Sequence, residues 1–323
     1  MNKKIRWGLL CASRIARTFI ADMQYVTNGE VVAIATRKPA DANAFAQEYD
    51  IKRAYAGYDA MLADPDIDAV YISSPHSLHY QHTKAAILAG KSVLCEKPFT
   101  VGAEQAIELQ QLARQHQVYV MEAMWTYFLP AIKQAKQWVE EGRIGQVVQI
   151  DADFGYPIPY SKTQREYNKD LGGGCLLEMG IYPVALAYLF TKQQPDKIYS
   201  VSRLAPNGVE DDVKMLLQYQ QPSGQIAVSL STSFIARLSN CAYIVGTEGY
   251  ISIPDFFRAR ECRLHVLDEQ VEHFFDPRKG SGFEFEIQAV GDDLLNQKQE
   301  SAVMPLHTSV ALQQMMSAIK KTF

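Results

Sequence analysis

Short apolar runs alternate with amphipathic stretches along the first 122 residues. Apolar and β-branched runs predict strands, and the stretches between them, with apolar residues at helical spacing, predict helices. The predicted strands are 5–10, 30–36, 69–73, 92–95 and 118–121, and the predicted helices are 13–23, 40–49, 58–63, 79–89 and 103–116. Alternation of this kind is typical of a parallel α/β sheet.

The pattern changes after residue 122. A helix at 130–141, a strand at 147–154 and an apolar helix at 175–190 precede strands at 198–204, 213–219, 226–232, 241–245 and 250–253, and a last helix covers 306–320. Strands joined by turns such as Pro222-Ser223-Gly224 predict an antiparallel sheet. We therefore expect an α/β chain. Residues 1–122 are expected to form a doubly wound parallel sheet, and residues 123–323 an α+β domain with a mainly antiparallel sheet, whose last helix can pack back on the first domain.

Composition narrows the class of protein. The chain has 323 residues, 47% hydrophobic and 21% charged, which suits a globular protein of two domains. A net charge of -4 and a pI near 6.0 give no basic patch for nucleic acid or an anionic membrane. The five cysteines include no C-x-x-C pair, so we expect reduced thiols in a cytoplasmic protein. We expect neither a signal peptide nor a membrane span.

The turn after the first predicted strand lies where a dinucleotide-binding fold places G-x-G-x-x-G. Here Cys11, Ser13 and Ala16 occupy the three glycine positions. These small residues still allow a pyrophosphate to approach the helix N-terminus. A tightly packed turn without a ligand explains the same residues.

The end of the second predicted strand indicates which cofactor such a fold would bind. An NAD site places an acid about 20 residues after the glycine motif, and here Thr36, Arg37 and Lys38 stand there instead. A guanidinium and an ammonium suit a 2′-phosphate, so the sequence favours NADP, with NAD as the alternative. A solvated basic turn is the reading without a ligand.

Lys97 follows the apolar strand Ser92-Val93-Leu94-Cys95 and is followed by Pro98. In a doubly wound sheet the carboxyl end of a strand opens into the ligand crevice. A lysine there points to a ligand contact or to a pair with a local acid.

Several motifs together resemble the Gfo/Idh/MocA oxidoreductase family. They are the turn at residue 11, Ser74-Pro75-His76-x-x-His79 and Glu96-Lys97-Pro98. The stretches Met121 to Thr126, Phe154-Gly155, Gly172 to Tyr182 and Gly208 to Asp212 are similar to the branch that holds dimeric dihydrodiol dehydrogenases and D-xylose 1-dehydrogenases. The resemblance covers nearly the whole chain, although Cys11 and Ser13 depart from the family's glycine-rich turn.

The resemblance implies a site between the nicotinamide cofactor and a small-molecule substrate. Lys97 and Tyr182 would be catalytic, with Tyr182 where many members carry a histidine and Glu178 where they often carry an aspartate. The residues implied for the cofactor are Cys11, Ala12, Ser13, Arg14, Ile15, Arg37, Lys38, Ser73, Ser74, Pro75, His76, His79, Glu96, Lys97 and Trp125. The substrate pocket would hold Trp125, Phe154, Glu178 and Tyr182. The resemblance also implies that residues 1–122 form a Rossmann-type domain, that the antiparallel sheet of residues 123–323 is open, and that two copies form a homodimer through this C-terminal sheet.

The chemistry of such a pair can be argued separately. A free tyrosine is a poor base at neutral pH, and a neighbouring ammonium corrects this by stabilising the phenolate. An aromatic wall for the flat face of a sugar or cyclic diol is expected from Trp125, Tyr127, Phe128, Phe154, Tyr156 and Tyr160, although core packing explains some of these residues equally well. His76 and His79 lack an evident third ligand, so we assign no metal.

The expected function is therefore NADP-dependent hydride transfer to or from a hydroxyl-bearing carbon of a sugar, polyol or cyclic trans-diol. Two other classes stay open. One is a non-catalytic redox sensor that binds NAD(P), and the other is an assembly protein that uses the second sheet as an interface. The sequence does not name the substrate, because specificity rests on loop positions.

Overall fold

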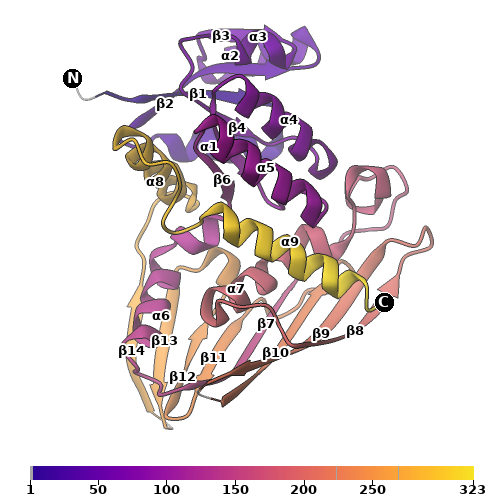
Figure 1. The fold of residues 1–323 in the computed structure, drawn as a ribbon, viewed down its shortest axis with the longest axis vertical. Helices are drawn as coiled ribbons and strands as arrows, with labels where there is room; N and C mark the ends of the chain where they lie inside the picture. Colours follow the sequence, from indigo (N-terminus) through magenta and orange to yellow (C-terminus); the bar gives the residue numbers. More distant parts are fainter. Residues whose placement is uncertain (1–2, 223, 268) are drawn as a thin grey trace. The chain divides into compact units, whose positions relative to one another are not determined.

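The computed structural model describes residues 3–222, 224–267 and 269–323, so Ser223 of the predicted turn lies outside the described residues. The chain divides into two compact units (Figure 1). One runs to Trp125 and includes Lys279–Val310, and the other comprises Thr126–Arg278 and Ala311–Phe323. The division near residue 122 was expected, but Lys279–Val310 was expected in the second domain and belongs to the first unit.

The first unit is built on a six-stranded sheet of order β3-β2-β1-β4-β5-β6, and every pairing in it is parallel. The strands are β1 (Ile5–Leu10), β2 (Gly29–Thr36), β3 (Arg53–Ala56), β4 (Ala69–Ile72), β5 (Ser92–Glu96) and β6 (Val120–Ala123). The central strand β4 is buried along its whole length, as expected for a sheet covered on both faces. The predicted Rossmann-type sheet is confirmed.

The helices of the first unit are α1 (Arg14–Met23), α2 (Pro39–Tyr49), α3 (Tyr58–Leu62), α4 (His76–Leu88), α5 (Ala103–His116) and α8 (Phe283–Leu295). Helix α1 begins where the sequence predicts, because the Ser13 side chain accepts a hydrogen bond from the Ala16 amide. Helix α9 (Leu306–Lys320) starts in this unit and continues in the other.

Helix α8 belongs to the first unit because polar groups anchor it to α1 and to the start of β2. The buried carboxylate of Asp22, in the last turn of α1, accepts hydrogen bonds from the amides of Ser281 (2.9 Å), Gly282 (3.1 Å) and Phe283 (3.0 Å). The Gly282 amide also donates to Glu284 Oε2 at 2.7 Å. Gly282, the N-cap residue, has no side chain to cap the helix, so Asp22 serves as the cap from α1.

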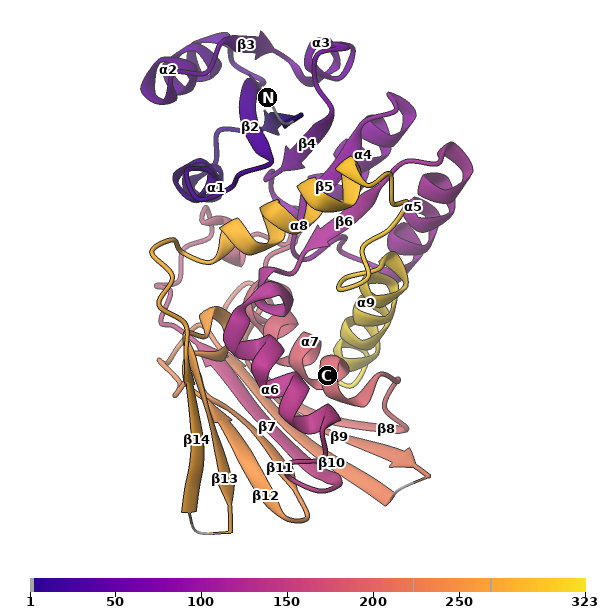
Figure 2. The same ribbon diagram turned by 90° about the vertical axis from the view of Figure 1, so that its left-hand side faces the viewer.

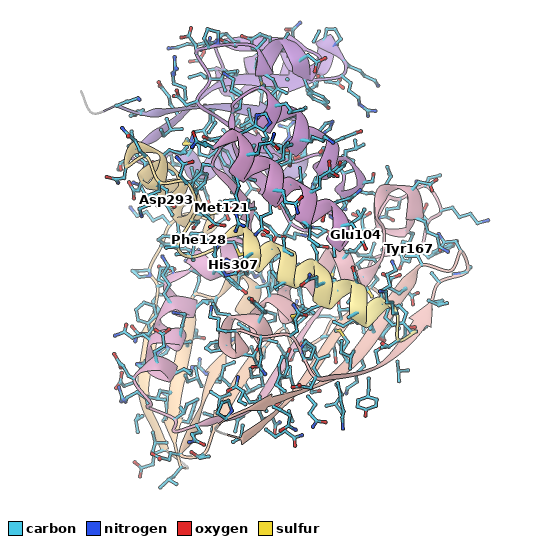
Figure 3. All side chains as sticks on the ribbon, in the orientation of Figure 1. Glu104, Met121, Phe128, Tyr167, Asp293 and His307 are labelled. Carbon is cyan, nitrogen blue, oxygen red and sulfur yellow. The ribbon has the colours of Figure 1, made fainter. Side chains whose placement is uncertain are left out.

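The other end of α8 is held by Tyr119, the residue directly before β6. The Tyr119 hydroxyl donates to Asp293 Oδ2 at 3.0 Å and also contacts the sulfur of Met121 (Figure 3). Midway, Gly291 lets α8 approach Asn28 closely, since a Cβ there would lie 2.3 Å from Asn28 Oδ1.

The second unit is built on an eight-stranded sheet of order β14-β13-β12-β11-β7-β10-β9-β8. Its strands are β7 (Val147–Gly155), β8 (Lys197–Leu204), β9 (Glu210–Gln221), β10 (Gly224–Ser233), β11 (Ala242–Gly246), β12 (Gly249–Ile253), β13 (Glu261–Val266) and β14 (Glu269–Phe275). All pairings are antiparallel except that of β7 with β10, so the predicted mainly antiparallel sheet is confirmed.

Two helices, α6 (Pro130–Glu140) and α7 (Ile181–Thr191), cover one face of this sheet (Figure 2). The predicted helix 175–190 is two segments, because Leu176–Gly180 forms a π-helical turn before α7. Among the described residues one helical stretch, Lys169–Thr191, is long and apolar enough to cross a membrane, and 89% of its most apolar window is buried within the protein. It is therefore a core element of the second unit.

The sequence predictions omit β3, β13, β14 and α8. Strand β3 is a four-residue edge strand, and β13 and β14 carry charged side chains on half-exposed positions. In α8 the acids Glu284, Glu286 and Asp293 are buried, so its burial pattern does not follow hydrophobicity.

The Asp22 cap of α8 yields a prediction. Asp22→Asn places an amide NH₂ against backbone donors, and we expect it to lower the free energy of unfolding by about 2–3 kcal/mol, the range for a lost hydrogen bond to a charged group. Denaturant unfolding measures this loss, and amide hydrogen exchange at 281–287 should accelerate. The exposed Asp50→Asn is the matched control. Unchanged exchange at 281–287 in Asp22→Asn would show that α8 does not depend on this cap.

Candidate functional site

The turn between β1 and α1 is held in one conformation by hydrogen bonds to β2 and to the end of β4. Cys11 has φ 91°, a left-handed conformation that usually requires glycine, and its amide donates to the Ala35 carbonyl at 3.0 Å. The Ser13 hydroxyl caps α1 and donates to the Ser73 hydroxyl at 2.8 Å, which ties the turn to the end of β4. Ala12 and Ile15 are partly buried beside this turn, and Arg14 is exposed. The turn is therefore fixed at the N-terminus of α1 without the family's glycines, and phosphate binding there stays a prediction.

A histidine ties the ends of β4 and β5 together. In the fully buried His79, Nδ1 lies 2.7 Å from the Pro98 carbonyl oxygen and Nε2 lies 2.8 Å from that of Ser74. Burial, with smaller effects from His76 and Lys97, lowers the pKa of His79 to about 3, so the neutral ring donates to only one carbonyl.

His76 and Pro75 begin α4. The His76 ring packs against His79 with centroids 5.7 Å apart. Among the residues that the structure describes, no group of three His, Cys, Asp or Glu side chains could hold a metal ion. The absence of a metal stays a prediction.

The backbone of Lys97 is fixed by the residue before it. Glu96 is buried at the end of β5, where one oxygen accepts from the Lys97 amide at 3.2 Å and the other accepts from the Tyr71 hydroxyl at 2.5 Å. Burial and the charge of Glu96 raise the pKa of Tyr71, so the phenol stays protonated and remains a donor. The peptide bond from Lys97 to Pro98 is cis. Lys97 therefore leaves β5 in one defined direction.

Two further buried carboxyl groups lie in the same unit, and the sequence predictions miss both. Glu122 in β6 accepts from the Phe99 amide at 2.8 Å, and burial, with Glu96 adding to the effect, raises its pKa to about 7. Glu286 in α8 is fully buried, and burial followed by the charge of Glu96 raises its pKa well above the usual range. Burial therefore shifts Glu286 toward its neutral form. The sequence analysis misses Glu286 because it does not predict helix α8, on which this residue lies.

A cavity of about 640 Å³ opens at the carboxyl end of β2. Its lining residues are Cys11, Ala12, Arg17, Thr36, Arg37, Lys38, Asp41, Ala44, Phe45, Glu48 and Tyr58. The predicted basic pair, Arg37 and Lys38, therefore lies beside the predicted phosphate turn. Both side chains are exposed, and the Thr36 hydroxyl donates to the Lys38 carbonyl at 2.6 Å, which fixes the start of α2.

In the second unit Tyr182 is buried among aromatic rings. The Phe154 ring meets it edge-on with centroids 5.3 Å apart, and Phe257 lies 5.9 Å from it. Phe154 and Phe257 stack at 4.1 Å, and Tyr156 meets Phe154 edge-on at 5.8 Å. Tyr182 lies in the first turn of α7, directly after the π-helical turn. The sequence predictions include Phe154, Tyr156 and Tyr182 but miss Phe257.

The other predicted residues are placed differently. Glu178, in the π-helical turn, forms an ion pair with Arg165 at 2.8 Å. Trp125, at the end of the first unit, packs on Phe283 of α8 with centroids 4.7 Å apart. Lys97 and Tyr182 belong to different units.

Half of the predicted aromatic wall serves packing in the second unit. The Tyr127 hydroxyl donates to the Ala185 carbonyl at 2.6 Å, and Phe128 is fully buried. Tyr160 packs edge-on against Tyr167. Figure 3 labels Phe128 and Tyr167.

Known proteins match both units. Residues 5–124 match the family model described as an oxidoreductase family with an NAD-binding Rossmann fold, and residues 132–252 match the GFO/IDH/MocA C-terminal domain. The trans-1,2-dihydrobenzene-1,2-diol dehydrogenases of Mus musculus and Homo sapiens are each 33% identical to this chain, and each alignment covers 98% of this chain and 96% of the relative.

Solved structures are similar over 99% of this chain. KijD10, a 3-ketoreductase from Actinomadura kijaniata in complex with NADP and TDP-benzene, is 27% identical with a TM-score of 0.87, and the match covers 98% of that protein. Its solved variants include a lysine-to-alanine and a tyrosine-to-phenylalanine replacement. An aldose-aldose oxidoreductase from Caulobacter crescentus, 21% identical over 97% of its own chain with a TM-score of 0.90, shares the fold. The predicted family is confirmed: this chain is an NAD(P)-binding oxidoreductase of the Gfo/Idh/MocA family.

Proposed function

We propose that the protein is an NADP-dependent dehydrogenase or reductase acting on a hydroxyl-bearing carbon of a sugar, a polyol or a cyclic trans-diol. The observation that carries the proposal is Lys97 at the end of β5, with its backbone fixed by the buried Glu96. The names of the relatives support the substrate classes, since they include a dihydrodiol dehydrogenase and a ketoreductase with bound NADP.

The first unit suits NADP. The Cys11 turn offers backbone to a pyrophosphate, and Arg37 and Lys38 line a cavity large enough for an adenosine phosphate. In the proposal the nicotinamide and its ribose are contacted by residues at or after the ends of β4 and β5 and by the residue at the end of the first unit. These residues are Ser73, Ser74, Pro75, His76, His79, Glu96, Lys97 and Trp125. Bound there, the nicotinamide supplies or accepts the hydride.

The proton is handled by the protein. In this proposal the Lys97 ammonium donates to the reacting oxygen and stabilises the phenolate of Tyr182, whose hydroxyl gives or takes the proton. Phe154 and Phe257 hold the Tyr182 ring through edge contacts and keep water from it. Trp125 and Phe154 offer apolar faces to the substrate. Glu178 pairs with Arg165, which suits a role in positioning the loop.

A homodimer in the cytoplasm belongs to the same proposal. One face of the second sheet is covered by α6 and α7. On the other, one cross-strand row runs through Tyr199, Leu216, Ser229, Asp151 and Tyr243, of which Tyr199, Leu216 and Tyr243 are 59%, 52% and 42% exposed. Large exposed side chains on both sides of a small polar centre suit a two-fold interface.

Turnover tests the function. We expect NADP⁺ reduction with at least one member of a panel of aldoses, polyols and cyclic diols. Tight NADP binding without turnover on that panel or on the matching carbonyl compounds would favour the redox-sensor alternative. No stabilisation by either dinucleotide would favour an assembly protein.

The cofactor prediction concerns Arg37. We expect the wild type to prefer NADP(H) over NAD(H), and Arg37→Ala to weaken NADP binding by about 1.5–3 kcal/mol, because a hydrogen bond to a charged phosphate is lost. Isothermal titration with both cofactors measures the change, and NAD affinity serves as the internal control. Equal wild-type affinity for the two cofactors would contradict the prediction.

The catalytic prediction concerns Lys97 and Tyr182. Lys97→Met and Tyr182→Phe should each lower kcat by about 10²–10⁴-fold, the usual contribution of a general acid–base group. The losses should not add in the double variant, since the two groups act as one unit. NADPH affinity, measured by fluorescence titration, should survive Tyr182→Phe. Wild-type turnover in Tyr182→Phe, with chemistry rate-limiting, would make Tyr182 a packing residue.

The association prediction concerns the uncovered face. Leu216→Asp should convert a dimer into a monomer, because it buries a charge in an apolar interface. Leu88→Asp is the matched control, since Leu88 is 55% exposed at the end of α4 in the first unit. Sedimentation velocity at micromolar concentration separates the two states. A monomeric wild type would refute the interface.

A further inference from the structure

The cavity at the end of β2 is lined by a third cationic side chain, in addition to Arg37 and Lys38, and the proposed cofactor site does not include it. Arg17, in α1, lines this cavity together with Arg37 and Lys38. We propose that Arg17 is a specificity-determining ligand of the NADP 2′-phosphate and that Glu48 positions its guanidinium for that contact. The inference rests on the proposed preference for NADP.

The guanidinium of Arg17 is held by three side chains of α2. It lies over the Phe45 ring, 5.0 Å from the centroid, and over the Tyr49 ring at 5.6 Å. Nη1 forms an ion pair with Glu48 and donates to the Tyr49 hydroxyl at 3.1 Å. Stacking on aromatic faces and a carboxylate partner together restrict a side chain that would otherwise sample many rotamers.

These contacts leave part of the guanidinium for another acceptor. Within the described residues, both hydrogen bonds of the Arg17 side chain come from Nη1. An arginine has five N–H donors in a planar fork, so the Nη2 and Nε hydrogens can serve a phosphate without breaking the Glu48 pair. Arg17 is therefore oriented in advance, and binding costs little of its rotamer entropy.

Without Arg17 the cavity lining would carry no net positive charge to attract a phosphate. Two carboxylates, Asp41 and Glu48, line the cavity with the three cations. Arg37 and Lys38 alone would only balance these two acids, whereas a phosphate monoester carries close to two negative charges at pH 7. With Arg17 the lining has a net positive charge, which favours the 2′-phosphate of NADP over the neutral 2′-hydroxyl of NAD.

Ligand fragments test the inference on the full-length protein without turnover. The affinities of 2′,5′-ADP and 5′-AMP are measured by isothermal titration for the wild type, Arg17→Met, Arg17→Lys and Glu48→Gln. We expect Arg17→Met to weaken 2′,5′-ADP binding about 10- to 100-fold, as hydrogen bonds to a charged group are lost, and to leave 5′-AMP within about twofold. Arg17→Lys should recover only part of the loss, since the planar fork is missing.

Glu48→Gln separates a binding role from a merely structural ion pair. It keeps an acceptor for Nη1 and removes a negative charge from the cavity, so the affinity for 2′,5′-ADP should rise relative to the affinity for 5′-AMP. If the pair only stabilised the contact of α1 with α2, the same change would lower the melting temperature and leave the ratio of the two affinities unchanged. Arg114→Met, an exposed arginine on α5 outside the cavity, is the control and should change neither ligand.

The outcomes distinguish this inference from the cofactor proposal. If the wild type binds 2′,5′-ADP and 5′-AMP equally well, the preference for NADP fails and the role of Arg17 fails with it. If the wild type prefers 2′,5′-ADP, and Arg37→Ala but not Arg17→Met abolishes that preference, the NADP site stands and Arg17 is a surface ion pair. An equal loss for both fragments in Arg17→Met would also overturn the inference.

Discussion

The proposed cofactor contacts of the first unit depend on one edge of its parallel sheet, where β2, β1, β4 and β5 lie side by side in that order. Parallel strands joined by helices bring all their carboxyl ends to the same edge. Thr36, Leu10, Ile72 and Glu96 end these four strands, so the residues that follow them are gathered although they are far apart in sequence. Hydrogen bonds then fix the loops: Ser13 to Ser73 between the ends of β1 and β4, and His79 between the ends of β4 and β5.

Burial at this edge decides which side chains can carry charge. Glu96 is paired with Tyr71 and with the Lys97 amide, whereas Glu122 and Glu286 are pushed toward the neutral form, partly by the charge of Glu96 itself. Shifting two of these three acids toward the neutral form lowers the cost of burying them together, compared with burying three anions. Lys97 leaves the sheet directly after this group of acids, because Glu96 is its neighbour in the chain.

Much of this site could be predicted because its signals are local. Glu96-Lys97-Pro98 follows one strand, and the basic pair Arg37-Lys38 follows another where an NAD site has an acid. In both cases a few consecutive residues are enough to predict a ligand contact. The rest depends on tertiary contacts. Helix α8 buries acids because Asp22 and Tyr119 provide partners for its ends. Phe257, in the short turn between β12 and β13, meets Tyr182 of α7 only in the packed unit. The ion pair of Glu178 with Arg165 likewise could not be inferred from the family position of an acid, since the partner lies 13 residues earlier in a loop.

Strand β7 sits at the centre of the second sheet, with a parallel partner, β10, on one side and an antiparallel partner, β11, on the other. The strands β11 to β14 pair successively with short connections, and so do β8 to β10, which means that each group closes only small loops. Strand β7 instead precedes both groups along the chain and must pair across about 70 residues or more. Long loops carry the larger entropic cost and slow folding. We therefore expect two locally formed meanders whose union waits for β7, so that the kinetics of folding of this unit depend on the strand that carries Phe154 to the site.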